Sequence, residues 1–474
     1  MSTRTPTPEQ QAAIDAAGEV LVSASAGSGK TFVMIEKMIA LILSGKADVS
    51  SVLAVTFTNL AAGEMKERLR AALSARINAE PDPAVRARLK AQLSEVPSAD
   101  VCTLHAFCVN VIRRYFYEAG IDGNFRVLEE TEADKLRERA VARAFDALLE
   151  QDSPRFASLC RAFAGSRGFG RLREVVRKAH EKVISRADYT DFLGGIAAKY
   201  TESAFDALAA EALAPVRAAA ERLRGKCIAL SAACEPFLRA GLFTEKHVAF
   251  LEGRRALAEE VLAAEDVFAA AKLFEGLKLM SKPPNTKLKA AGSEEALALD
   301  ERMASLKEEV DGLKKMLAAF RPREEELAAF LSSGEIAAAP PEAVLAYDAE
   351  YAALKRRAGG LDFSDLEHKC LALLEIPRVG AEVRGRYTHV FVDEYQDVNP
   401  AQERILSLVA GENVFMVGDA KQSIYGFRGC SPAFFSEKYE LLRGEGRALT
   451  LNGNFRSCTA VLGAVNRLFS GVVT

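Results

Sequence analysis

The stretch VLVSASAGSGKT, from Val20 to Thr31, constrains the fold of this chain more than any other. It opens with the apolar run VLV, which is typical of a buried parallel strand. After the Lys-Thr pair comes FVMIEKMIALILSG, an apolar segment of helical length that ends at Gly45. The order of strand, glycine-rich loop and helix therefore predicts an α/β fold with the loop at a helix N-terminus.

Such a loop is suited to hold phosphate. Its backbone N–H groups can point at phosphate oxygens at the positive end of the helix dipole. Gly27 and Gly29 allow close approach and positive φ. Lys30 can reach the β- and γ-phosphates, and the Thr31 hydroxyl can ligate Mg²⁺. The predicted nucleotide-binding residues are Ala24, Ser25, Ala26, Gly27, Ser28, Gly29, Lys30 and Thr31.

The loop alone leaves an alternative open. The strict pattern G-x-x-x-x-G-K-[ST] has glycine where this chain has Ala24. A plain glycine-rich turn that enters a buried helix would show the same residues. The loop indicates a nucleotide without indicating what the protein does with it.

Composition limits the class of protein. A chain of 474 residues is long enough for about two to four domains. With a net charge of −3, any nucleic-acid binding must come from local basic surface. The eight cysteines include no C-x-x-C pair and indicate reduced thiols, not a zinc site or a disulfide framework. The N-terminus has no apolar signal segment and no run reaches transmembrane length, so we expect a cytoplasmic protein without a membrane partner.

A second apolar run, in THVFVDEYQD, delivers two acids at its end. Asp393 and Glu394 follow the run at the edge where open α/β sheets bind their ligands. Asp393 can hold the Mg²⁺ that bridges the phosphates, and Glu394 can act as general base on the attacking water. Adjacent acids after a strand often only cap the next helix. Together with the glycine-rich loop they predict nucleotide hydrolysis, which needs both halves.

These blocks resemble those of superfamily 1 DNA helicases of the UvrD/Rep type, and more closely the AddA/RecB helicase–nuclease branch. That family's loop is A-x-x-G-x-G-K-T, which accommodates Ala24. Its acidic motif D-E-x-Q-D is found here as Asp393, Glu394, Gln396 and Asp397. The resemblance implies a RecA-like P-loop NTPase core with a parallel sheet, interrupted by a large all-helical insert. It also implies ATP and Mg²⁺ as cofactors.

Three further blocks carry the ATP residues that the resemblance implies. TPEQQAAI has Gln10 in the adenine-reading position, and an amide can bond the adenine edge bidentately. In VGDAKQSIYGFRG, Gln422 would sense the γ-phosphate. NGNFRS supplies Phe455, placed to stack on adenine, and Arg456, placed to reach the γ-phosphate. The implied catalytic residues are Lys30, Glu394, Gln422 and Arg456.

The resemblance also implies DNA contacts. VTFTNLAAGEM resembles the first DNA-contacting motif, although Leu60 stands where Lys is usual. TLHAF resembles the next such motif, and LDFSDL the block that precedes the acidic strand. Phe427 is expected to stack on a base where many relatives carry Trp, with Tyr425 the weaker candidate. The implied DNA-binding residues are Thr56, Phe57, Asn59, His105, Tyr425 and Phe427.

Structural alternatives stay open for several of these residues. Phe57 and Phe427 could be core aromatics, although the glycines of YGFRG favour an exposed loop. His105 could be a core histidine with satisfied hydrogen bonds. Arg428 could hold a phosphate, although we favour its pairing with a carboxylate of the acidic motif.

The middle of the chain, from about Arg126 to Gly360, is rich in Ala, Leu, Glu and Arg with helical periodicity. Its two long segments AFDALAAEALAPVRAAAERLRGKCIALSAACEPFL and LDERMASLKEEVDGLKKMLAAF predict amphipathic helices. Between them, the segment 278–292 breaks the helix at Pro283-Pro284. A solvated loop is the simpler interpretation, and a patch contacting duplex DNA ahead of the fork is the alternative. The lysines of this segment are Lys278, Lys282, Lys287 and Lys289.

These features predict four parts along the chain. They are the first part of a RecA-like motor lobe (1–125), a helical inserted domain (126–360), the second part of the lobe (361–450) and the start of a truncated second lobe (451–474). The family's second-lobe arginine, its second DNA-gripping motif and its nuclease motif are not found before Thr474. We therefore expect an N-terminal fragment that by itself has weak ATPase activity or none.

The resemblance implies the ATP-binding part of an ATP-dependent 3′–5′ DNA helicase, similar to the AddA chain of helicase–nucleases or to the beta chain of exodeoxyribonuclease V. Such an enzyme couples ATP hydrolysis to translocation on single-stranded DNA and unwinding in double-strand-break repair. The implied partners are single-stranded and forked DNA and a second helicase–nuclease chain, AddB- or RecC-like. The alternatives are a UvrD-like repair helicase without a nuclease, and a nucleotide-switched DNA-binding module that does not translocate.

Overall fold

The computed structural model describes residues 5–163, 168–284, 286, 293–426, 429–430 and 432–470. The chain divides into two compact units. Unit 1 comprises Met1–Ser153, Cys160–Asp191 and Ala343–Thr474, and unit 2 comprises Pro154–Leu159 and Phe192–Glu342. The α/β class with a long helical stretch, predicted from the sequence, is confirmed.

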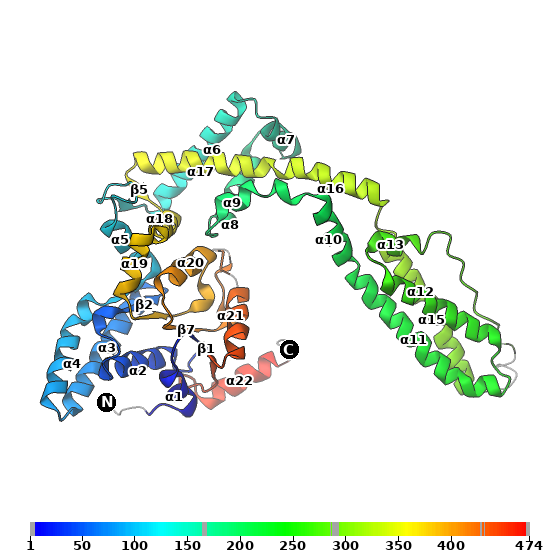
Figure 1. Ribbon diagram of the computed structural model, residues 1–474, viewed down its shortest axis with the longest axis horizontal. Coiled ribbons are helices and arrows are strands. Elements are labelled where there is room, and N and C mark those ends of the chain that lie inside the picture. The colour runs from blue at the N-terminus through cyan, green and yellow to red at the C-terminus, as the bar shows by residue number, and fades with distance from the viewer. Residues whose placement is uncertain are drawn as a thin grey trace. The chain divides into compact units, whose positions relative to one another are not determined.

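Within the described residues, unit 1 is built on a six-stranded sheet of order β3-β2-β6-β7-β1-β8 (Figure 1). Every neighbouring pair of strands in it is parallel. The strands are β1 (Val20–Ala24), β2 (Val52–Thr56), β3 (Asp100–Thr103), β6 (His389–Val392), β7 (Val414–Gly418) and β8 (Ala448–Leu451). Because β6, β7 and β1 are neighbours that run in one direction, the loops that follow them meet at one edge of the sheet.

Strand side chains alternate between two apolar layers, because successive residues of a strand point to opposite faces. In β1, Val20 and Val22 join one layer and Leu21 joins the other. Helices of the first layer are α1 (Pro8–Asp15), α2 (Lys30–Leu43), α3 (Asn59–Ala79) and α4 (Pro83–Glu95). Helices of the second layer are α5 (Leu104–Arg114), α18 (Phe363–Glu375), α19 (Pro377–Arg386), α20 (Pro400–Val409) and α21 (Pro432–Gly444). Helices thus cover both faces, as a parallel sheet requires.

Two short strands of unit 1 lie at the borders of the predicted helical insert. β4 (Arg126–Val127) pairs in parallel with β5 (Gly360–Leu361). The chain thus leaves and re-enters this part of unit 1 at neighbouring points, as an insertion requires. Other helices with residues in unit 1 are α6 (Glu130–Glu150), α8 (Gly170–Val183), α22 (Thr459–Phe469) and parts of α7 (Pro154–Phe163), α9 (Tyr189–Gly194) and α17 (Ala339–Arg357).

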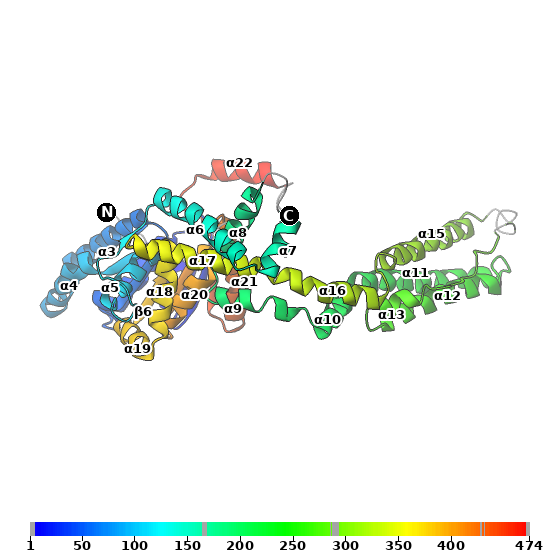
Figure 2. The same cartoon turned by 90° about the horizontal axis from the view of Figure 1, so that it is seen from above.

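Unit 2 is helical over its described residues, and α11 (Ala214–Arg239) supplies the largest share of its core. The buried side chains of α11 recur at helical spacing, among them Val216, Leu223 and Leu230. Figure 2 shows α11 beside α12 (Glu245–Ala263) and α15 (Glu294–Leu317), which pack against it. Further helices of unit 2 are α10 (Glu202–Ala212), α13 (Val267–Lys272) and α16 (Arg323–Ala337).

The predicted break at Pro283-Pro284 is confirmed, because residues 277–284 form neither helix nor strand. Lys282 donates to Asp300 at 2.6 Å, and the Asp300 side chain is almost fully buried. This ion pair ties the segment to α15, so Lys282 has a structural partner within unit 2. Lys287 and Lys289 lie outside the described residues, and a DNA-contacting role for this segment stays a prediction.

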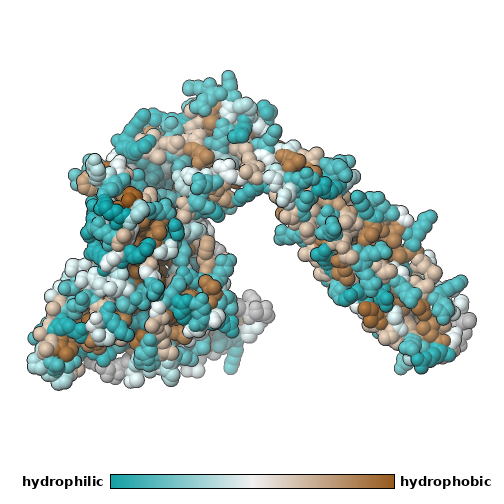
Figure 3. Space-filling model, viewed as in Figure 1, coloured by the Kyte–Doolittle hydropathy of each residue, from teal (hydrophilic) through white to brown (hydrophobic). Residues whose placement is uncertain are grey.

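The surface is mostly polar. Figure 3 shows hydrophilic residues over most of the viewed surface, with hydrophobic ones scattered between them. Among the helices that the structure describes, none combines the length and the apolar character needed to cross a bilayer.

Phe391 on β6 provides a test of the two-layer core. Its side chain is 1% exposed, and its ring centroid lies 5.7 Å from that of Phe415 on the neighbouring strand β7. We expect Phe391→Ala to lower the free energy of unfolding by about 3–5 kcal/mol, the cost of a buried aromatic cavity. Urea unfolding measures this. Phe434→Ala, at a side chain 40% exposed on α21, is the matched control and should cost less than about 1 kcal/mol. Equal effects of the two variants would contradict this core.

Candidate functional site

The glycine-rich loop runs from the end of β1 to the first residue of α2. Gly27 and Gly29 have φ of 80° and 93°, in the left-handed region that glycine tolerates. The Ser28 N–H donates to the Ser25 carbonyl at 3.1 Å, which closes the loop. The loop N–H groups therefore gather at the start of a 14-residue helix, where an anion is favoured.

Gln10 lies against this loop and is 1% exposed. Its side-chain oxygen accepts from the Thr7 N–H at 3.1 Å in the capping box of α1, and its Nε2 donates to the Ser28 carbonyl at 2.9 Å. The structure thus places the predicted adenine-reading amide next to the loop, with both ends of the amide already engaged. Recognition of adenine by Gln10 would require the amide to give up at least one of these partners.

A buried lysine holds the helix that carries Gln10. Lys37 on α2 donates to the carbonyls of Ile14 (3.0 Å) and Ala16 at the C-terminus of α1. Burial lowers the pKa of Lys37 to about 8. A cation at a helix C-terminus satisfies otherwise unpaired carbonyls, so α1 is fixed to the helix that follows the loop.

The NGNFRS segment is docked on the loop by backbone hydrogen bonds. The Phe455 N–H donates to the Gly27 carbonyl at 2.8 Å, and Asn454 donates to the Ala26 carbonyl at 3.0 Å. A Cβ on Gly27 would lie 2.9 Å from both Asn454 Oδ1 and Arg456 Cβ, so only glycine allows this approach. Phe455 is 47% exposed and Arg456 is exposed, each next to the loop.

The acidic pair follows β6. The Asp393 N–H donates to the Val55 carbonyl on β2 at 2.9 Å, which continues the ladder by one residue. Glu394 then adopts φ 51°, which is rare for a residue with a side chain. Lys30 Nζ donates to Glu394 Oε2 at 2.8 Å, with the two side chains 12% and 32% exposed. Two motifs 364 residues apart along the chain therefore meet, as predicted from the sequence.

The electrostatics of Asp393 favour a cation. Burial and the adjacent Glu394 carboxylate raise the pKa of Asp393 to about 6, against the opposing influence of Lys30. Two carboxylates therefore share one lysine at neutral pH. Asp393 and the Thr31 hydroxyl, at the second residue of α2, offer the hard oxygen donors that Mg²⁺ prefers.

Gln422, in the short 3₁₀-helix η5 (Ala420–Gln422), is connected to this pair through side chains. Its Nε2 donates to Asp419 Oδ2 at 2.7 Å. The Asp419 N–H donates to Gln396 Oε1 at 2.9 Å, and Gln396 Nε2 donates to Glu394 Oε2 at 2.9 Å. Residues after β1, β6 and β7 thus form one polar cluster at the sheet edge.

A cavity of about 610 Å³ opens on the other side of the acidic pair. Asp393 and Glu394 line one part of it, and three of the predicted DNA-binding residues, Thr56, Phe57 and His105, line another. Phe57 is 37% exposed, which does not fit a core aromatic, and its ring centroid lies 4.6 Å from that of Tyr425. Their role in DNA binding stays a prediction.

Buried polar residues hold His105 at this cavity. Its Nε2 lies 3.0 Å from Glu367 Oε1, and Glu367 also accepts from Asn399 at 3.1 Å and Gln402 at 2.6 Å. Burial raises the pKa of Glu367, but these donors outweigh it and the pKa lies below its usual value. Glu367 is therefore an ionised, fixed carboxylate. His105 remains 31% exposed in its side chain, so it combines a satisfied nitrogen with access to the cavity.

The remaining predicted DNA residues lie at the start of α3 or outside the described residues. Thr56 is 3% exposed and donates to the Thr58 carbonyl at 3.0 Å, whereas Asn59 is exposed as the first residue of α3. Leu60 is 75% exposed, so its position is open to a ligand although it carries no charge. Phe427 and Arg428 lie outside the described residues.

Sequence reasoning missed four residues that the structure places at the site. Phe363, 50% exposed, has its ring centroid 4.8 Å from that of His105, although its block LDFSDL was noticed without a role for it. Glu367 follows that block and gave no local signal. Asn454 and Gln396 stand inside recognised blocks, but only the tertiary contacts reveal what they bond.

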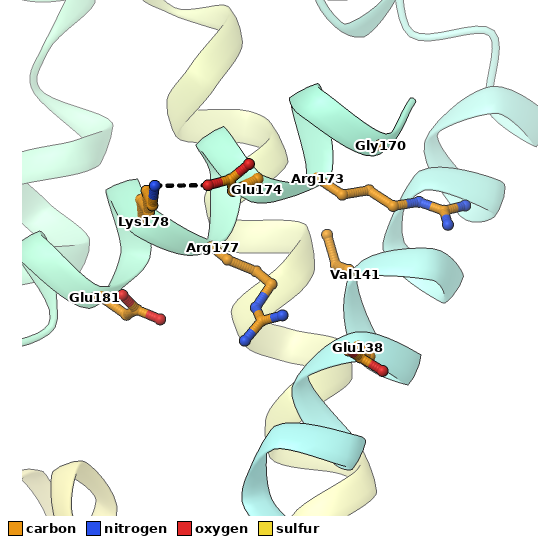
Figure 4. A pocket seen from close by; sticks show the side chains of 8 residues that line it. All are labelled: Glu138, Val141, Gly170, Arg173, Glu174, Arg177, Lys178 and Glu181. Carbon is orange, nitrogen blue, oxygen red and sulfur yellow. Dashed lines mark hydrogen bonds and ion pairs between the residues drawn. The ribbon is translucent and has the colours of Figure 1, made fainter. Parts of the chain in front are cut away.

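A second cavity, of about 510 Å³, lies between α6 and α8. Figure 4 shows charged side chains of both helices around it, with Lys178 donating to Glu174 at 2.6 Å. Arg177 extends from α8 and pairs with Asp134 at 3.4 Å. Acids and bases alternate around this cavity, so it has no clear preference for an anion.

The parallel sheet, the glycine-rich loop after β1 and the acidic pair after β6 define a P-loop NTPase with a RecA-like core. The model of the UvrD/REP helicase N-terminal domain matches residues 6–442. The chain belongs to this family, as its motifs predicted.

Several curated relatives are named as one of the subunits of an ATP-dependent helicase/nuclease. The proteins of Desulfitobacterium hafniense (strain DSM 10664 / DCB-2) and Pelotomaculum thermopropionicum are each 34% identical over 99% of this chain. The protein of Desulforudis audaxviator is 35% identical over 100% of it. The chain spans 36%, 38% and 40% of the lengths of these relatives, respectively.

The raised pKa of Asp393 gives a prediction for the ligand-free protein. Its pKa of about 6 exceeds the ordinary 3.8, so ionised Asp393 destabilises the fold above pH 6 and this cost disappears as the pH falls to about 4. Asp393→Asn keeps an acceptor for the Glu394 N–H. In EDTA at pH 7.5 it should therefore stabilise the chain by roughly 1–3 kcal/mol, a gain that fades towards pH 4.5.

Thermal melts at several pH values measure this gain. Asp146→Asn, at an exposed position of α6, is the matched control and should change the melting temperature little at any pH. A destabilised Asp393→Asn at pH 7.5 would contradict the crowded-carboxylate description.

Proposed function

We propose that this chain is the ATP-binding part of an ATP-dependent 3′–5′ DNA helicase of the AddA helicase–nuclease type. In this proposal, ATP hydrolysis drives translocation on single-stranded DNA and duplex unwinding in double-strand-break repair. The observation that carries the proposal is the contact of Lys30 with Glu394. It joins a phosphate-binding loop to a general-base candidate beside a cavity lined by the predicted DNA residues.

Nucleotide binding would exchange one partner of Lys30 for another. Without nucleotide, Lys30 and Glu394 neutralise each other at 2.8 Å. The β- and γ-phosphates, held by the loop N–H groups, would draw the Lys30 ammonium to themselves. Glu394 would then be free to accept a proton from the attacking water. Gln422 and the exposed Arg456 would contact the γ-phosphate, and Phe455 would stack on adenine.

Asp393 and Thr31 fit the role of Mg²⁺ ligands. The raised pKa of Asp393 indicates a carboxylate with too little positive charge near it, which a divalent cation would supply. Mg²⁺ neutralises charge on the transferred phosphoryl group when bound. The chain itself would orient the phosphates through the loop and the water through Glu394.

The DNA part of the proposal rests on aromatic residues at the cavity. Phe57 and Tyr425 form an adjacent pair of rings, and bases of any sequence can stack on such faces. Because the acidic pair lines the same cavity, movements of Asp393 or Glu394 during hydrolysis could reach the DNA directly. Single-stranded or forked DNA is therefore the proposed substrate.

The partner and the domain roles belong to the same proposal. The relatives are named as subunits, which supports a second chain, AddB- or RecC-like, and a cytoplasmic location follows from a role in DNA repair. We assign the first motor lobe to 1–125 and 361–450, an inserted helical domain to 126–360 and the start of the second lobe to 451–474. The β4–β5 pairing supports the insertion.

Replacing Lys30 tests nucleotide binding. Lys30→Met removes a charge from a partly buried phosphate site, and such contacts are worth roughly 2–5 kcal/mol. Affinity for Mg-ATP should therefore fall by about 30-fold or more in a calorimetric titration. Lys46→Met, at an exposed lysine just after α2, is the matched control and should bind as the wild type. Equal affinities of Lys30→Met and wild type would refute the ATP site.

Replacing Phe57 tests the DNA face. Stacking of one base on an aromatic is worth about 1–3 kcal/mol, so Phe57→Ala should weaken binding of an oligothymidine about 5- to 150-fold. Fluorescence anisotropy measures this. The salt dependence should not change, because no phosphate contact is lost. Phe116→Ala, at a side chain 43% exposed elsewhere in unit 1, is the control. Equal effects of the two variants would refute stacking on Phe57.

A further inference from the structure

Gln396 is a buried amide whose orientation the structure fixes. It is 2% exposed and lies in the 3₁₀-helix η4 (Tyr395–Asp397). Its Nε2 donates to Glu394 Oε2 at 2.9 Å and to Asp397 Oδ2 at 3.3 Å, and its Oε1 accepts from the Asp419 N–H at 2.9 Å. A flipped amide would face two carboxylates with its oxygen, so only one orientation is stable.

The backbone around Gln396 is shaped to admit this side chain. A Cβ on Gly418, the last residue of β7, would lie 2.4 Å from Gln396 Oε1 and 3.2 Å from its backbone nitrogen. Ser423 donates its hydroxyl to the Gln396 carbonyl at 3.3 Å. The chain after β7 therefore closes on Gln396 from two sides, and glycine at position 418 makes the closest approach possible.

The two ends of the amide face the two halves of the site. One end holds Glu394, which carries the Lys30 contact. The other end holds the backbone of Asp419, whose carboxylate accepts from Gln422 at 2.7 Å. A donor and an acceptor on one side chain of this length are both needed, and among the amino acids glutamine supplies them.

We infer that Gln396 is a positioning residue that sets the Glu394 carboxylate for hydrolysis and couples it, through Asp419, to the γ-phosphate contact of Gln422. The inference rests on the proposed function. Once phosphate draws Lys30 away, Gln396 is the donor that remains on Glu394 Oε2, so it keeps the general base in place during the chemical step. Gln396 itself touches neither nucleotide nor water in this assignment.

Two variants of Gln396 separate its bonds. Gln396→Met keeps the length and apolar volume of the side chain and removes both hydrogen-bonding ends. Gln396→Glu keeps the acceptor for Asp419 and replaces only the donor that faces Glu394, so it adds a repelling oxygen. Single-turnover hydrolysis of radiolabelled Mg-ATP by excess 474-residue chain gives the rate of the chemical step, and calorimetry gives the nucleotide affinity.

We expect Gln396→Met to slow hydrolysis about 10- to 100-fold and Gln396→Glu to slow it further, because small misplacements of a catalytic group cost rates of this size. Nucleotide affinity should stay within about twofold, because the loop and Lys30 are untouched. A merely structural role would lower affinity and melting temperature together with the rate. If Gln396→Met fails to fold, Gln396→Glu decides alone, since it preserves shape and one bond.

Gln92 provides the matched control. It is also a buried glutamine, 7% exposed on α4, with Oε1 accepting from the Val49 N–H at 2.7 Å and Nε2 donating to Asp48 at 2.9 Å. Gln92→Met and Gln92→Glu should leave the hydrolysis rate within about twofold.

Unchanged rates in both Gln396 variants, with a wild type that hydrolyses ATP, would overturn the positioning role alone. Equal losses in the Gln92 and Gln396 variants would overturn it as well. A wild type that neither binds nor hydrolyses ATP would overturn the proposed function together with it.

Discussion

The contact of Lys30 with Glu394 is the interaction on which the site depends, and the order of the sheet makes it possible. The lysine starts the helix after β1, and the glutamate follows β6, two places away in the sheet. Parallel strands place their carboxyl ends at one edge, so residues 364 positions apart reach 2.8 Å. Any change that shifted the β6–β7–β1 register by one residue would turn these side chains to the wrong face.

Glycine decides how closely the segments at this edge approach each other. At Gly27 the NFR segment crosses the phosphate loop, and at Gly418 the Gln396 amide crosses the end of β7. At both positions an added Cβ would lie under 3.0 Å from a neighbouring atom, so the backbone itself forms part of the contact. Only Gly27 also has positive φ, so its glycine is required twice over. Two kinds of constraint therefore hold the cluster together.

Local patterns predicted the elements and failed for the contacts between them. The apolar runs before Ala24 and Asp393 are β1 and β6, and the periodic middle segments are helices, because each signal is contained within one element. The engagement of the Gln10 amide by Thr7 and Ser28 could not be predicted, because it depends on where α1 packs. Glu367 and Asn454 escaped for the same reason. β4 and β5 have two residues each, too few to show a periodicity.

The ligand-free site combines several costs that a nucleotide with its cation would remove. Glu394 holds a left-handed backbone conformation, and Asp393 carries a raised pKa because it is buried and a second carboxylate adjoins it. Strain of this kind persists only where surrounding contacts over-determine it, and here Lys30, Gln396 and the Val55 carbonyl do so. A bound phosphate takes Lys30, and a cation takes the excess charge of Asp393. The energy that relaxes in this exchange is released beside Phe57 and His105, which line the same cavity. Because the acids and the predicted DNA residues share that cavity, the two sites can be coupled through their own walls without a long relay.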